Sequence, residues 1–122
     1  MCSAVFANLK PGGRFFAINS DGKKLLQFSS QATNSAIWYT FEPTRIKDGD
    51  PVKVSLKHGD AKVEFEHFIY CRETYEQVLK AAGFNNIICH PMMLPLELAG
   101  SKMWCEYVQD GPQELFECQK PF

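Results

Sequence analysis

The sequence lacks the features of a membrane-spanning, secreted or nucleic-acid-binding protein. No run approaches the roughly 18 apolar residues that a membrane-spanning helix needs, and the first residues lack the basic region and apolar core of a signal peptide. The 13 basic and 14 acidic residues leave a net charge of −1, without a basic cluster. We therefore expect a cytoplasmic protein whose main partner is neither nucleic acid nor a membrane.

Metal-binding and disulfide patterns are also missing. The five cysteines form no Cys-x-x-Cys pair of the kind found in zinc and redox motifs, and their odd number argues against a disulfide framework. The histidines, His58, His67 and His90, fit no known metal-ligand spacing. We expect reduced thiols and no metal site.

Common catalytic loops are absent as well. The chain contains no Gly-x-Ser-x-Gly of a serine hydrolase and no Gly-x-Gly of a dinucleotide-binding loop. Pro11-Gly12-Gly13 precedes a strand instead of opening a helix, so it lacks phosphate-binding geometry. Cys89 and His90 are neighbours along a predicted strand and point to opposite faces, which argues against a dyad between them. Motifs alone therefore assign no catalytic residue.

What the sequence does contain is a helix, tight turn and buried strand near its start. Apolar residues with helical spacing end at Pro11-Gly12-Gly13, which stops a helix. The apolar run Phe15 to Ile18 is typical of a strand covered on both faces, as in a parallel sheet under helices. This unit is half of a βαβ motif. Asn19 follows at the carboxyl end of the strand, the edge where open α/β sheets bind ligands.

The polar segment from Asp21 to Ser35 is predicted to be a loop. Leu25, Leu26 and Phe28 interrupt its polar character. They either pin the loop to the core, which is the commoner role, or line a ligand cavity. The sequence leaves both roles open.

Alternation of apolar and polar residues predicts strands over 36–41 and 52–67, the second of these being a β-hairpin with one face in water. A two-residue His58-Gly59 loop would place Lys53 opposite Glu64, so that opposite charges meet. A three-residue loop would place the apolar side chains of one strand on the opposite face of the hairpin from those of its partner strand. We therefore predict the two-residue loop.

The rest of the chain alternates helices with strands. A stripe of apolar residues at helical spacing indicates a helix over 72–82, and Gly83 is a natural residue to follow its end. A short strand over 86–90, a helix over 101–109 and a last strand over 114–119 complete the predicted order.

Two of these segments together resemble class I S-adenosylmethionine-dependent methyltransferases. Leu9-Lys10-Pro11-Gly12-Gly13-Arg14 is similar to the family's helix end and fifth strand, which corresponds to residues 13–19 here. Glu73 to Phe84, reading Glu-Thr-Tyr-Glu-Gln-Val-Leu-Lys-Ala-Ala-Gly-Phe, is similar to the helix and turn before its sixth strand. Order and rough spacing both match. The resemblance covers nearly all of residues 1–122, but only the carboxyl-terminal half of a usual methyltransferase domain.

The resemblance implies an α/β fold with a partial Rossmann-like sheet of the fifth to seventh strands. The hairpin would be inserted after the fifth strand, and the strand over 114–119 would lie antiparallel beside the fifth. The implied activity is methyl transfer from S-adenosylmethionine, as methyl donor, to a small-molecule acceptor. The family's glycine-rich loop and the acidic residue that hold this cofactor have no match in the chain, so no cofactor-binding residue is assigned.

Four residues are candidates for binding the acceptor substrate. Asn19 can hydrogen-bond a substrate or only cap its strand, and the sequence does not decide between these roles. Tyr39 and Tyr70 lie where the family builds its acceptor pocket and can stack on a flat acceptor, although ordinary packing is the commoner role. His90 follows the sixth strand at the ligand edge, or is a strand-end histidine satisfied by the backbone.

A second interpretation assigns no chemistry to this chain. A non-catalytic fragment or half-domain would act by completing its sheet with another chain, or by self-association. An exposed sheet edge and uncovered Phe15, Phe16 and Ile18 would drive that association.

Overall fold

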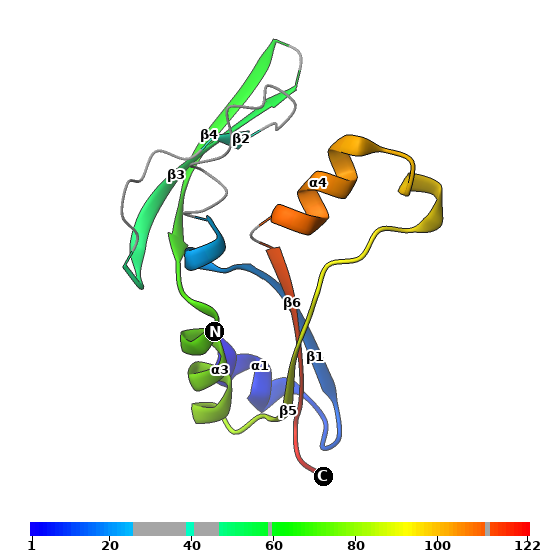
Figure 1. Cartoon of the computed structure of the whole chain (residues 1–122). Coiled ribbons are helices and arrows are strands. Elements are labelled where there is room, and N and C mark those ends of the chain that lie inside the picture. Colours follow the sequence, from blue (N-terminus) through cyan, green and yellow to red (C-terminus); the bar gives the residue numbers. More distant parts are fainter. Residues whose placement is uncertain (26–38, 41–46, 59, 112) are drawn as a thin grey trace.

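The computed structural model describes residues 1–25, 39–40, 47–58, 60–111 and 113–122. The chain has a mixed α/β fold with two three-stranded antiparallel sheets (Figure 1). In chain order its elements are α1 (Cys2–Asn8), β1 (Arg14–Ser20), β2 (Tyr39–Thr40), β3 (Asp50–His58), β4 (Ala61–Ile69), α3 (Arg72–Ala81), β5 (Asn85–His90), the 3₁₀ helix η1 (Leu96–Leu98), α4 (Lys102–Asp110) and β6 (Gln113–Gln119).

Strand β6 is the centre of the first sheet, whose order is β1–β6–β5. It runs antiparallel to both neighbours, so that β1 and β5 are parallel to each other. Phe116 lies opposite Ala17 on one side and opposite Cys89 on the other. The last strand in the sequence therefore joins two strands that come much earlier, and Figure 1 shows it between them.

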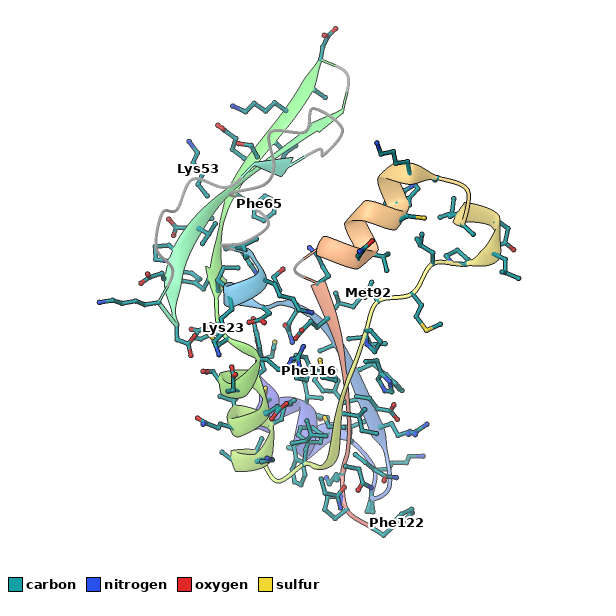
Figure 2. All side chains as sticks on the ribbon, viewed as in Figure 1. Lys23, Lys53, Phe65, Met92, Phe116 and Phe122 are labelled. Carbon is teal, nitrogen blue, oxygen red and sulfur yellow. The ribbon has the colours of Figure 1, made fainter. Side chains whose placement is uncertain are left out.

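The main core lies on the face of this sheet that α1 and α3 cover. Phe116, which is 1% exposed, packs with Leu79, Phe84 and Cys118, and Figure 2 places it on the α3 side of the sheet. The Phe6 ring of α1 meets the Phe84 ring edge-on, with centroids 5.1 Å apart. Strand alternation places every second residue of β1 and β6 in this core.

The apolar run of β1 was predicted to be covered on both faces, but only one face is covered. Phe15 packs in the core and stacks on Phe84 with ring centroids 6.0 Å apart, so the second interpretation, which left Phe15 uncovered, was wrong at this residue. Phe16 and Ile18 are 51% and 64% exposed on the opposite face. A continuous apolar run does not reveal which of its alternating residues face a helix, so the sequence could not separate Phe15 from Phe16.

Both ends of helix α3 are capped by hydrogen bonds. At its start, Asp48 accepts hydrogen bonds from the Cys71 backbone N–H, at 2.8 Å, and from the Thr74 hydroxyl. These bonds, the one from Thr74 first, lower the pKa of Asp48. At its end, Gly83 has φ of 102° and the Phe84 N–H donates to the Leu79 carbonyl at 3.2 Å. This is the glycine-dependent end predicted from the sequence.

The second sheet has the order β2–β3–β4 and contains the hairpin. Its predicted register was wrong by two residues: Lys53 lies opposite Glu66, and His58 opposite Ala61. The sequence that follows His58 reads Gly-Asp, a favoured two-residue hairpin sequence that competes with the predicted His-Gly loop. A shift of two keeps each side chain on its face, and Lys53 still reaches Glu64 diagonally at 3.7 Å.

The segment predicted as a loop over 21–35 begins with a helical turn at residues 22–25. The Asp21 carboxylate accepts a hydrogen bond from the Lys23 N–H at 3.3 Å, which is the usual way for aspartate to cap a helix start. Leu25 is fully buried with Val52 and Ile69, so it packs in a second small core. Leu26, Phe28 and most of the strand predicted over 36–41 lie outside the described residues, and only Tyr39–Thr40 is described there as a strand.

We predict that Phe116→Ala lowers the free energy of unfolding by about 3–5 kcal/mol, because it removes a fully buried aromatic ring and leaves a cavity. Urea denaturation followed by circular dichroism measures the change. Leu96→Ala is the control, since Leu96 is 91% exposed, and it should shift the free energy by less than about 0.5 kcal/mol. Equal effects of the two substitutions would contradict a core centred on Phe116.

Candidate functional site

A buried carboxylate organises the edge of the first sheet where β1 and β5 end. Glu114, which is 2% exposed, is the second residue of β6 and receives a hydrogen bond from Arg72 Nε at 3.0 Å and a second one from the same guanidinium. Lys24 Nζ lies 2.9 Å from Glu114 Oε1, and the Cys89 thiol lies 3.4 Å from Oε2. We call Glu114, Arg72, Lys24 and Cys89 the Glu114 cluster. It connects β6, α3, the turn after β1, and β5.

Contacts within the cluster shift the pKa values of Glu114, Arg72 and Cys89. Burial alone would raise the pKa of Glu114, but hydrogen bonds from Arg72 and Lys24 outweigh it and lower the pKa to about 2. The hydrogen bond with Glu114 in turn raises the pKa of Arg72. Burial, followed by the charge of Glu114, raises the pKa of the Cys89 thiol to about 11. The thiol is therefore protonated at neutral pH and is not a nucleophile.

Asn19 lies beside this cluster. It is the residue of β1 directly opposite Glu114, and it is half-buried on the helix-covered face. The register of the sheet therefore places an amide side chain next to a fixed ion pair at the carboxyl end of a strand. This is the position from which a side chain can hydrogen-bond a ligand at the edge of an open sheet.

Tyr70 is brought to the same edge. Its backbone forms a parallel bridge with Asp21, and its carbonyl accepts a hydrogen bond from the Gly22 N–H at 3.1 Å. Its ring is partly exposed and packs edge-on against Tyr75, with centroids 5.9 Å apart. Tyr39, by contrast, belongs to β2, where its backbone pairs with Leu56.

His90 lies at the end of β5 on the other face of the sheet. Alternation along β6 and β5 sets it beside Leu115, whereas Asn19 and Glu114 share the helix-covered face. Its Nε2 is 2.7 Å from Glu117 Oε2, and Arg14 Nη2 is 2.5 Å from the other oxygen of Glu117. A carboxylate, not the backbone, is therefore the partner of this histidine.

The acidic side chains at this edge of the sheet are bonded to other side chains or to the backbone, and the described residues form no metal-binding cluster. In the part of the chain that the structure describes, no three His, Cys, Asp or Glu side chains gather to hold a metal ion. Both carboxylates at the edge already have partners: Glu114 is held by two cations, and Asp21 accepts from the Lys23 N–H. No described helix is long and apolar enough to cross a membrane.

Sequence reasoning missed the Glu114 cluster. The available signal was the alternation of Glu114 with Phe116 and Cys118, which puts an acidic side chain on the apolar face of the last strand. A carboxylate in that position needs a cationic partner, because an unpaired buried charge is costly. Arg72 and Lys24 are 42 and 90 positions away (114 − 72 and 114 − 24), and nothing local identified them.

We predict that Glu114→Gln weakens the pH dependence of stability in acid. The pKa of this carboxyl falls from 4.5 to about 2 on folding, so its contribution is complete above about pH 4.5 and is lost as the pH falls toward 2. Between pH 5 and 3 the unmodified chain should lose about 1–2 kcal/mol more than the variant, after discounting for solvent screening of the half-exposed cations.

Urea denaturation at pH 7, 5, 4 and 3 gives the free energies for this comparison. Glu73→Gln is the matched control, since Glu73 pairs with Lys23 at 2.8 Å but is exposed, and it should leave the acid slope nearly unchanged. The same slope for the Glu114→Gln variant and the unmodified chain would contradict the charged cluster.

Comparisons with known proteins support the fold. No protein-family model and no curated protein matches the chain. Among solved structures, the chain is similar to the crystal structure of a proposed S-adenosylmethionine-dependent methyltransferase from Listeria monocytogenes, with a TM-score of 0.55 and 23% sequence identity. The match covers 99% of this chain and 54% of that chain, so this chain spans about half the length of that protein. The likeness shows that the chain has a methyltransferase-like fold.

Proposed function

We propose that this chain is the carboxyl-terminal half of a class I S-adenosylmethionine-dependent methyltransferase domain, and that the domain methylates a small-molecule acceptor. The observation that carries the proposal is the β1–β6–β5 sheet, in which an antiparallel strand lies between two parallel ones. In the resembled family the seventh strand is likewise antiparallel beside the fifth. On this assignment β1, β5 and β6 are the fifth, sixth and seventh strands of a partial Rossmann-like sheet.

The second sheet supports the same assignment. It is built from residues between β1 and α3, which is where the family inserts material that surrounds the acceptor. Asp48 ties the turn before β3 to the start of α3, and the Tyr70 backbone is bonded to the end of β1. The inserted sheet is thus held against the edge where β1 ends, beside Asn19.

We assign the binding site for S-adenosylmethionine to residues that lie outside this chain. When bound, it supplies an activated methyl group. The side chains at the sheet edge are committed to each other in the Glu114 cluster, and the chain has no glycine-rich loop. The proposed role of this half is to bind and orient the acceptor, with Asn19 as hydrogen-bond partner and Tyr39 and Tyr70 as stacking surfaces. His90 lies on the face of the first sheet opposite Asn19. It is therefore proposed to contact the acceptor only at the edge of the sheet where β5 ends.

One observation favours the alternative of a non-catalytic half-domain that associates with another chain. Phe16 and Ile18, exposed on the face of the first sheet opposite α1 and α3, offer apolar surface that a partner could cover. In that case the Glu114 cluster is a structural ion pair, and Asn19 only caps its strand.

Calorimetric titration with S-adenosylmethionine tests the methyltransferase proposal. We predict a Kd on the order of micromolar for the native assembly that contains this chain, and no binding by the isolated 122-residue chain. ATP is the control, because it shares the adenosine but lacks the sulfonium and amino acid groups. An assembly that ignores S-adenosylmethionine, or that binds ATP equally well, would overturn the proposal.

A further inference from the structure

A histidine held by a buried carboxylate lies at the carboxyl end of β5. His90 is the last residue of that strand, and its Nε2 is 2.7 Å from Glu117 Oε2. Glu117 is 8% exposed, and Arg14 Nη2 lies 2.5 Å from its other oxygen. The carboxylate is thus held by a cation from β1 and by an imidazole from β5. A carboxylate that is fixed in this way orients the ring that it contacts.

The second ring nitrogen of His90 is left without a partner. A carboxylate accepts hydrogen bonds, so Glu117 selects the neutral imidazole form that carries its proton on Nε2. Nδ1 then keeps a lone pair, and among the described residues it has no hydrogen-bond partner. The His90 side chain is also 39% exposed. A histidine with one nitrogen held by a carboxylate and the other nitrogen available has the arrangement of a general base.

Two more polar side chains lie on the same face where the strands end. Ser20 of β1 is paired with Gln113 of β6, which lies two residues before Leu115, the partner of His90. Gln113 and His90 are therefore diagonal neighbours on one face. The Gln113 Oε1 atom is buried without a hydrogen-bond partner in the part of the chain that the structure describes. It indicates a donor that these residues do not supply, and the half-buried side chain can turn its amide toward the edge.

This end of the sheet is also the ligand side of the fold. Ligands of open α/β sheets bind beyond the carboxyl ends of the strands, and β1 and β5 both end here. Asn19 lies on the helix-covered face and His90 on the other face, so a ligand that crosses the end of the sheet meets both side chains. Strands added beside β1 would leave the strand ends open, so the position of His90 does not depend on how far the sheet extends.

We propose that His90 is the general base of the methyl transfer and that the group methylated is a hydroxyl of the acceptor. The inference rests on the proposed function and names its substrate class. A hydroxyl holds its proton at neutral pH and therefore needs a base, whereas a thiolate acceptor does not. A second hydrogen-bond donor on the acceptor, beside the reacting hydroxyl, would satisfy Gln113 Oε1.

The step balances within the groups named. The hydroxyl oxygen forms a bond to the methyl carbon of the donor sulfonium, and the bond from that carbon to sulfur breaks, with its electron pair going to sulfur. The hydroxyl proton passes to His90 Nδ1, and the ring becomes an imidazolium. Glu117 is a positioning residue, because it orients the ring and stabilises the charge that the ring gains.

Methyl transfer by the native assembly that contains this chain tests the proposal, with methyl-labelled S-adenosylmethionine and a low-molecular-weight cell extract as the source of acceptors. We expect the label on oxygen. We also expect a rate that falls at least 100-fold in His90→Gln, while the Kd for S-adenosylmethionine is unchanged. His67→Gln is the matched control, because His67 is an exposed histidine on β4, and it should keep the full rate.

The outcomes separate this inference from the proposed function. An assembly that binds S-adenosylmethionine but labels nitrogen, sulfur or carbon, or labels no product, would overturn the inference and leave cofactor binding intact. An unchanged rate in His90→Gln would overturn it as well. An assembly that does not bind S-adenosylmethionine would overturn both proposals.

Nitrogen-15 NMR of the 122-residue chain tests the state of the ring without any acceptor. We expect the His90 signals, identified by their loss in His90→Gln, to show the proton on Nε2 while the imidazole is neutral. Glu117→Gln removes the charge that selects this form. It should shift the population toward the other form and lower the rate of methyl transfer without changing the Kd for S-adenosylmethionine. A proton on Nδ1 in the unmodified chain would overturn the proposal, since that nitrogen would have no lone pair for the acceptor proton.

Discussion

The pairing of β6 with β1 and β5 at the same time holds the first sheet together. β1 and β5 are parallel to each other but are not adjacent in the sheet. Their relative position therefore depends on β6, which lies between them. The same strand supplies Phe116 and Cys118 to the core and Glu114 to the ion cluster. Backbone pairing, apolar burial and charge pairing thus all converge on a segment near the end of the sequence, and α1 and α3 pack on the face that this segment creates.

The Glu114 cluster gives the carboxyl edge of the sheet a fixed geometry. Arg72 is the first residue of α3, and Lys24 lies in the turn that follows β1, so a single carboxylate connects the start of a helix with the end of a strand. Two cations and a thiol satisfy its oxygens, which is what makes burial of the charge possible. Asn19 and the Tyr70 backbone lie at this edge of the sheet. The contacts that stabilise the edge therefore also position the residues proposed to bind the acceptor.

Local signals in the sequence predicted several elements but not their long-range contacts, and they missed the helical turn at residues 22–25. The Pro11-Gly12-Gly13 turn, the apolar stripe before Gly83 and the alternation over the hairpin each depend on neighbouring residues, and the structure has a strand, a helix and a hairpin at these places. The hairpin register depended on a choice between two overlapping sequences that each favour a turn, His58-Gly59 and Gly59-Asp60. The first was predicted, and the predicted register was wrong by two residues. The pairing of Glu114 with Arg72 and the separation of Asn19 from His90 by a sheet both arise from tertiary contacts, which no local pattern encodes.

Amide hydrogen exchange along β1, at a concentration where the chain is monomeric, tests most directly the claim that β6 lies antiparallel beside it. The N–H groups of Phe15, Ala17 and Asn19 face β6, whereas those of Phe16 and Ile18 face the free edge. The account predicts exchange on the order of 100-fold slower for the first three. Equal exchange along the strand, or slow exchange at Phe16 and Ile18 alone, would contradict the central position of β6 and with it the methyltransferase-like fold.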